Sequence, residues 1–173
     1  GIVMEQFENH SKTYREVISE LASEKVSEKH SVKTLSTLEL GCYGEAVASE
    51  YLCRNGYQIV ARNVKNKRGE IDILAAKLLG DNKSISVKEA MAMAVGQEPI
   101  LTAVEVKTRR SLTYGFAREA VNHLKQMHIR QTLLWYLASH PQWSGYRIRF
   151  DVIEVYIAPN GEATVKHWPG CFE

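Results

Sequence analysis

Several features that would assign a chain to a specialised class are missing from this sequence of 173 residues. Its three cysteines form no CxxC pair, so neither a disulfide framework nor a cysteine-built zinc site is expected. The six histidines show no HExxH motif and no pair at close metal-ligand spacing, which argues against a histidine-built zinc site. No apolar run approaches the roughly 20 residues that a membrane span needs. We therefore expect a globular, cytoplasmic protein without a membrane partner.

A net charge of one sign is also missing, because 22 Lys and Arg residues stand against 20 Asp and Glu residues. The charges are nevertheless segregated along the chain. Residues 1–39 carry seven acidic and five basic side chains, residues 54–68 carry five basic ones and no acid, and residues 106–130 carry six basic ones and one acid. Two basic stretches thus bracket isolated acids, which suits a phosphate-bearing ligand. Basic runs are also commonly just solvated faces, and that alternative stays open.

The chain divides into an N-terminal arm and one domain. Apolar residues at helical spacing over the first 25 or so residues predict an amphipathic helix, and a polar linker follows it. We predict an arm and linker over residues 1–37, packed on the domain or on a second subunit in a homodimer, and a domain over residues 38–173. Residues 77–100 break the rhythm of that domain and indicate an insert, read as a short helix or as a hairpin extension.

The domain has the pattern of an α/β fold with a mixed sheet. Helical spacing predicts one helix over residues 38–55, stopped by Gly56, and a long second helix over residues 116–139. The predicted order is helix, three strands, helix and a last strand, with strands at 57–63, 70–76, 101–108 and 147–156. The apolar spacing of the second helix predicts an inner stripe of Ala120, Val121, Leu124, Met127, Leu134 and Ala138.

Two neighbouring predicted strands carry charge on one face. Side chains alternate along a strand, so Glu105 and Lys107 lie on the same face of the predicted strand 101–108. Asp72 of the strand 70–76 lies beside Glu105 if the two strands pair. Two carboxylates that close repel, and one takes up a proton unless a cation sits between them. Hard oxygen ligands, with no Cys or His, favour Mg²⁺ or Mn²⁺ over zinc.

The first predicted helix supplies a further carboxylate, since Glu45 lies on or beside its inward stripe. A metal held by Asp72 and Glu105, with Glu45 completing the set and Lys107 beside it, meets the requirements of phosphodiester hydrolysis. The cation activates a water, and the lysine orients that water or stabilises the developing negative charge. The alternative is an ordinary salt bridge between Glu105 and Lys107 on an exposed sheet face.

More basic residues lie close to this predicted site in the sequence. Arg109, Arg110 and Arg118 follow the charged strand, and Lys125 lies one residue beyond the predicted inner stripe of the second helix. Each is a candidate phosphate ligand in a nucleic-acid complex. Solvated arginines at a loop and helix start explain the first three equally well, and a surface lysine is the commoner explanation of Lys125.

Two other groups are predicted to be structural. Asp151 on the last strand is expected to pair with Arg149 or Arg147. Trp135 and Trp168 are expected to be core or dimer contacts, because no basic run alternates with them as it would in a base-stacking platform.

Taken in order, the motifs resemble those of a known family. The main motifs are Gly44-Glu45-x-x-Ala48, Arg62-Asn63, Gly69-Glu70-Ile71-Asp72, Val104-Glu105-Val106-Lys107 and Arg149-Phe150-Asp151-Val152. The set is similar to the bacterial YraN family of predicted endonucleases, which is related to the archaeal Holliday-junction resolvases in the PD-(D/E)XK nuclease superfamily. The match covers roughly residues 38–157.

The resemblance implies a restriction-endonuclease-like, three-layer core in the order α-β-β-β-α-β. It implies that Asp72 is the metal-binding aspartate, and that Glu105 and Lys107 are the glutamate and catalytic lysine of the superfamily. Glu45 matches the helix glutamate of the resolvase-like branch. The implied activity is Mg²⁺- or Mn²⁺-dependent endonuclease cleavage of DNA, including branched or structured DNA. Two alternatives remain: a non-catalytic nucleic-acid-binding or adaptor protein, and an interaction protein whose partner docks on the arm and insert.

Overall fold

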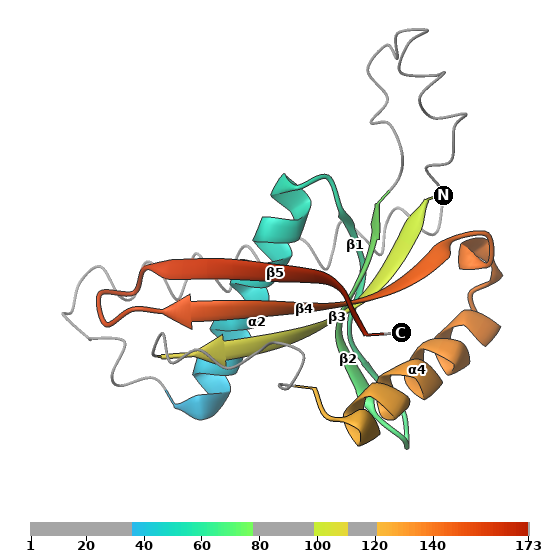
Figure 1. Ribbon diagram of the computed structural model, residues 1–173, viewed down its shortest axis with the longest axis horizontal. Coiled ribbons are helices and arrows are strands. Elements are labelled where there is room, and N and C mark those ends of the chain that lie inside the picture. Colours follow the sequence, from blue (N-terminus) through green and yellow to red (C-terminus); the bar gives the residue numbers. More distant parts are fainter. Residues whose placement is uncertain (1–35, 78–98, 111–120, 173) are drawn as a thin grey trace, which may run out of the picture. The chain divides into compact units, whose positions relative to one another are not determined.

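Figure 1 shows the computed structural model, which describes residues 36–77, 99–110 and 121–172. These residues form a five-stranded sheet with two α-helices and one 3-10 helix. The predicted α/β class and element order are confirmed. The elements are α2 (Thr37–Arg54), β1 (Gln58–Lys65), β2 (Glu70–Lys77), β3 (Ile100–Arg109), α4 (His123–Ala138), the 3-10 helix η2 (Pro141–Trp143), β4 (Arg147–Ile157) and β5 (Ala163–Phe172).

The sheet is mixed, and its strands follow the chain in the order β1-β2-β3-β4-β5. All neighbours are antiparallel except β3 and β4, which run parallel. A parallel pair needs a crossover connection, and α4 lies in it. The edge strand β5 was not predicted, because Pro169 and Gly170 interrupt its alternation; an edge strand tolerates proline because its outer amides need no partner.

Helix α2 is defined by local signals at both ends. Ser36 and Glu39 form a reciprocal capping box at its start. The predicted glycine stop is present at Gly56, whose φ of 80° lies in the left-handed region. In the middle of the helix, a Cβ built on Gly44 would lie 1.8 Å from Oγ1 of Thr108. The backbone of α2 therefore lies directly on β3, and only glycine fits at this crossing.

The two helices cover opposite faces of the sheet. Leu101 and Ala103 of β3 belong to one buried cluster with Ile129 of α4. Thr108, an odd number of residues away on the same strand, points to the other face and contacts α2. In Figure 1, α2 passes behind β3, β4 and β5, whereas α4 lies on the side of β2. The result is the three-layer arrangement that the resemblance implies.

The predicted inner stripe of α4 is mostly wrong. Leu124, Met127 and Leu134 are 57%, 40% and 67% exposed, and Ala138 is exposed too. Apolar residues occur at helical spacing on two sides of this helix, and periodicity cannot choose which side meets the sheet. The other side of the helix packs on the sheet. Its buried apolar residues are Ile129 and Leu133, and Val121 just before the helix belongs to the same cluster.

Some predictions fall outside the described residues. They concern nearly all of the arm at 1–37, residues 78–98 of the insert, and residues 111–120, which include Arg118. The second helix begins at His123, with Asn122 as its N-cap, so its predicted start at residue 116 is wrong. The described residues belong to one compact unit. Among the helices that the structure describes, none has the length and apolar character required to cross a membrane.

Candidate active site

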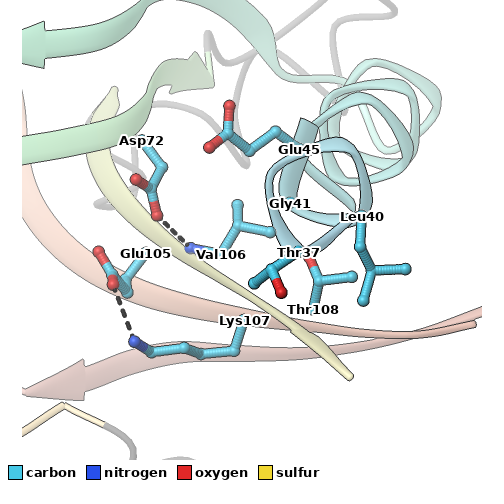
Figure 2. Close-up of a pocket in the computed structure, with 9 residues that line it drawn as sticks. All are labelled: Thr37, Leu40, Gly41, Glu45, Asp72, Glu105, Val106, Lys107 and Thr108. Atoms are coloured by element: carbon cyan, nitrogen blue, oxygen red, sulfur yellow. Dashed lines mark hydrogen bonds and ion pairs between the residues drawn. The ribbon is translucent and has the colours of Figure 1, made fainter. Parts of the chain in front are cut away.

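The site is built where β2 and β3 separate. Their ladder ends with Ile73 opposite Val104, and the same register continued places Asp72 next to Glu105. At this point the side chain of Asp72 replaces the strand backbone as acceptor, because its Oδ2 receives a 2.8 Å hydrogen bond from the amide of Val106 (Figure 2). The two carboxylates are thus neighbours, as predicted, and a backbone amide of β3 holds Asp72 in place.

The carboxylate of Glu105 is buried, with 4% of the residue exposed. Its Oε1 lies 3.2 Å from Nζ of Lys107 and 3.3 Å from Nζ of Lys125, which reaches over from α4. Its Oε2 is also buried and receives no hydrogen bond. A buried carboxylate oxygen without a donor is costly and is rare in folded proteins. One oxygen of Glu105 is therefore neutralised by two lysines, while the other is left for an additional positive group or a proton.

Asp72 bears the electrostatic consequence of this crowding. Burial first, and then the negative charge of Glu105, raise the pKa of Asp72 to about 7. The charge of Glu45 and a hydrogen bond with Glu105 raise this pKa further, whereas the hydrogen bond from Val106 lowers it. A carboxyl group with this pKa is half protonated near neutral pH, and a nearby cation would favour its ionised form.

Glu45 projects from α2 toward Asp72 (Figure 2). Its pKa is raised, chiefly by burial and next by the charge of Glu70, while a hydrogen bond with the side chain of Asn63 lowers it. Asn63 has a φ of 48°, a left-handed conformation that asparagine adopts more readily than most residues. No role was predicted for Asn63 from the sequence. The available signal was its place in the Arg62-Asn63 motif.

Together these groups border a pocket of about 240 Å³ between α2 and β3. Within the residues that the structure describes, no three His, Cys, Asp or Glu side chains converge as closely as a complete metal cage requires. Mg²⁺ is commonly held by one or two carboxylates and several waters, so the Asp72–Glu105 pair and the unpartnered Oε2 suit such an ion. The lining residues are Thr37, Leu40, Gly41, Glu45, Asp72, Glu105, Val106, Lys107 and Thr108.

The predicted phosphate ligands are placed differently from one another. Lys125 reaches Glu105 and therefore lies at the carboxylate pair. Arg109 directs its Nε toward Oε1 of the buried Glu154, 3.7 Å away. Arg110 is exposed at the end of β3. Of these candidates, Lys125 is the one that α4 brings to the carboxylates of β2 and β3.

Asp151 does not belong to this site. It is fully buried and pairs with Val104 in the ladder, so it lies on the face opposite to Glu105. Arg149 binds both of its oxygens at 2.8 and 2.7 Å, and Nε2 of His167 lies 2.7 Å from Oδ2. The prediction that Asp151 is structural and paired with Arg149 is confirmed.

Comparison with known proteins gives a consistent assignment. The family model described as "Uncharacterised protein family UPF0102" matches residues 44–155. A UPF0102 protein of Syntrophotalea carbinolica is 36% identical over 140 residues, covering 81% of this chain and 96% of the relative. One from Rhodococcus opacus is 37% identical over 131 residues, covering 75% and 92%. A third, from Caldicellulosiruptor bescii, is 32% identical over 126 residues, covering 73% and 89%. The chain therefore belongs to the UPF0102 family, which is the YraN family that its motifs resemble.

Proposed function

We propose that the protein is a divalent-metal-dependent endonuclease that hydrolyses phosphodiester bonds in DNA, including branched or structured DNA. The observation that supports this most is the strained carboxylate pair. Asp72 has a pKa of about 7 beside Glu105, and Oε2 of Glu105 is buried without a donor. Perturbed carboxylates in a pocket are typical of functional sites, and a shared cation would relieve the repulsion between these two.

The residues of the chain divide the work as follows. Asp72 and Glu105 would hold Mg²⁺ or Mn²⁺, and a bound ion would supply a lowered pKa for a water and positive charge against the scissile phosphate. Lys107, with Nζ 3.2 Å from Glu105, stabilises the negative charge that develops on the phosphate oxygens. Glu45, whose pKa is raised by burial, accepts a proton from the attacking water. Lys125, with Nζ 3.3 Å from Glu105, contacts a phosphate of the bound strand.

A non-catalytic DNA-binding or adaptor role is the second candidate. It is favoured by the two lysines at Oε1 of Glu105, because they neutralise that carboxylate without any metal. In this alternative the charged cluster serves as structure, and the basic residues around it contact phosphates without cleavage.

Cleavage assays distinguish the two roles. Wild type is incubated with supercoiled plasmid, single-stranded DNA and a four-way junction, with and without Mg²⁺ or Mn²⁺. We expect metal-dependent cleavage, reduced roughly 100- to 1,000-fold in Asp72→Asn and Lys107→Ala. Glu50→Gln, on the exposed side of α2, is the matched control and should cleave like wild type. If no substrate is cleaved, and calorimetry shows the same metal binding for wild type and Asp72→Asn, the nuclease proposal fails.

A further inference from the structure

A second groove lies between the β1–β2 turn and α4. It has a volume of about 630 Å³, which is within the range of small-ligand sites. Two of its lining residues are large apolar side chains left in solvent: Leu134 is 67% exposed and Trp135 is 53% exposed. The remaining lining is cationic or amide in character. The lining residues are Asn66, Lys67, Arg68, Gln131, Leu134 and Trp135.

The groove has the charge of an anion-binding surface. None of the described residues that line it is acidic. In the described part of the chain, neither Lys67 nor Arg68 forms an ion pair with a carboxylate, although Lys65 nearby pairs with Glu70. Two unpaired cations next to an exposed indole match the two parts of a nucleotide, since the cations attract the phosphate and the ring offers a face to the base.

The two walls of the groove are held together by close packing. A Cβ built on Gly69 would lie 2.8 Å from Cβ of His128, so the turn approaches α4 as closely as a glycine permits. Oγ1 of Thr132 donates a 3.3 Å hydrogen bond to Oδ1 of Asn66, which in turn accepts from the amides of the turn. The basic turn and Trp135 therefore keep a fixed spacing, as a preorganised binding surface requires.

Both walls lead to the carboxylate pair. Along the turn and β2, Arg68 precedes Asp72 by four residues, which is about 13 Å at the rise of a strand. Along α4, Trp135 follows Lys125 by ten residues, which is about 15 Å at the rise of a helix. The groove therefore lies within about 15 Å of the carboxylate pair along either wall, a distance that a few nucleotides of one DNA strand span.

We propose that this groove binds an unpaired segment of the DNA substrate, with a base stacked on Trp135 and the adjoining phosphate held by Lys67 and Arg68. The choice of DNA rests on the proposed function; the stacking and charge rest on the groove itself. A paired base is already stacked on its neighbours, so an indole at this place favours strands whose bases are free, such as those near a branch or a frayed end.

Binding without metal tests this proposal separately from catalysis. A short labelled single strand and a hairpin duplex of the same sequence are titrated in EDTA, and affinity is read by fluorescence anisotropy. We expect Trp135→Ala to weaken single-strand binding roughly 5- to 100-fold, with a smaller effect on the duplex. Trp135→Phe should restore most of the affinity. The double variant Lys67→Ala/Arg68→Ala should flatten the slope of log affinity against log salt by about 1.4, the value for two single-strand phosphate contacts.

The control is Leu124→Ala, which removes an exposed apolar side chain from the same helix outside the groove and should leave both affinities unchanged. The proposal is overturned if Trp135→Ala binds the single strand as wild type does. It is also overturned if sedimentation shows that Trp135→Ala only dissociates a dimer, because the groove would then hold a second copy of the chain. If wild type cleaves no substrate but Trp135→Ala loses single-strand binding, the groove assignment stands and the nuclease proposal is rejected. If wild type cleaves DNA but the groove variants bind the single strand as wild type does, the nuclease proposal stands and the groove assignment is rejected.

Discussion

The backbone amide of Val106 donates a 2.8 Å hydrogen bond to Oδ2 of Asp72 and so holds this carboxylate against β3, beside the carboxylate of Glu105. The two negative charges repel, and with burial they raise the pKa of Asp72 to about 7. The fold keeps an unfavourable pair in place by a hydrogen bond whose donor is a backbone amide of β3. Such local electrostatic cost is typical of sites selected for function rather than for stability.

The raised pKa of Asp72 predicts a pH-dependent stability. The pKa is about 7 in the folded state against 3.8 as a reference, so this group favours folding fully below about pH 4 and less as the pH rises toward 7. Asp72→Asn removes the charge and still accepts from Val106. We expect its Tm to exceed that of wild type by on the order of 5 °C near pH 8, with the excess vanishing near pH 4. Differential scanning fluorimetry measures both.

Metal provides the control for this prediction. Mg²⁺ should raise the Tm of wild type near pH 8 and leave that of Asp72→Asn unchanged, because only an ionised pair attracts the cation. A Tm difference between the two proteins that does not vary with pH would contradict the assignment of the shift to Asp72.

Replacing the two lysines at Glu105 should change different properties: metal affinity for Lys125 and cleavage rate for Lys107. Lys125→Met keeps the aliphatic stem but removes a charge 3.3 Å from Oε1, so Glu105 becomes more attractive to a cation and Mg²⁺ should bind severalfold more tightly by calorimetry. Lys107→Met should instead lower the cleavage rate by roughly 100-fold or more. Weaker Mg²⁺ binding in Lys125→Met would show that Lys125 supports the metal site rather than competing with it.

The contact between α2 and β3 predicts a sharp difference between two glycines of one helix. Gly44→Ala places a methyl group 1.8 Å from Oγ1 of Thr108, and should lower the free energy of unfolding by about 1–3 kcal/mol. Gly41→Ala meets nothing within 4 Å and should raise it by up to about 1 kcal/mol, because alanine favours helix. Urea unfolding measures both, and equal stabilities would contradict the close approach.

The Asp151 cluster predicts a second pH effect of opposite sign. Burial alone would raise the pKa of Asp151, but hydrogen bonds from His167 and Arg149 outweigh burial and lower it below its reference value of 3.8. Its contribution to stability is therefore present above that value and is lost as the pH falls below it. Asp151→Asn leaves the half-buried Arg149 with weaker partners at a fully buried position, and should lower the free energy of unfolding by about 3–5 kcal/mol.

The matched comparison for Asp151 is an exposed ion pair. Glu50 pairs with Arg54 on the outer side of α2, and Glu50→Gln should change the free energy of unfolding by no more than about 0.5 kcal/mol. If the two variants have similar effects in urea unfolding, the Asp151 cluster is not the buried structural element that its contacts indicate.

Local patterns predicted much of the fold because their causes are local. The capping residues and glycine stop of α2 act within a few residues of the chain, and strand alternation already placed Glu105 and Lys107 on one face. Strand β5 was not predicted, because its pairing with β4 outweighs the local effect of the proline and glycine in it. The buried face of α4 was misjudged because both of its apolar stripes satisfy the helical period, and only contact with the sheet distinguishes them.

The sequence by itself determined the α/β order, the family, and which carboxylates and lysine share neighbouring strands, since these follow from short-range pattern and spacing. Tertiary structure decided what each of these groups meets. It brought Lys125 of α4 to Glu105, and the basic β1–β2 turn to Trp135, across more than sixty positions of sequence in the second case. Such contacts depend on the packing of whole elements against one sheet, and no window of sequence contains that information.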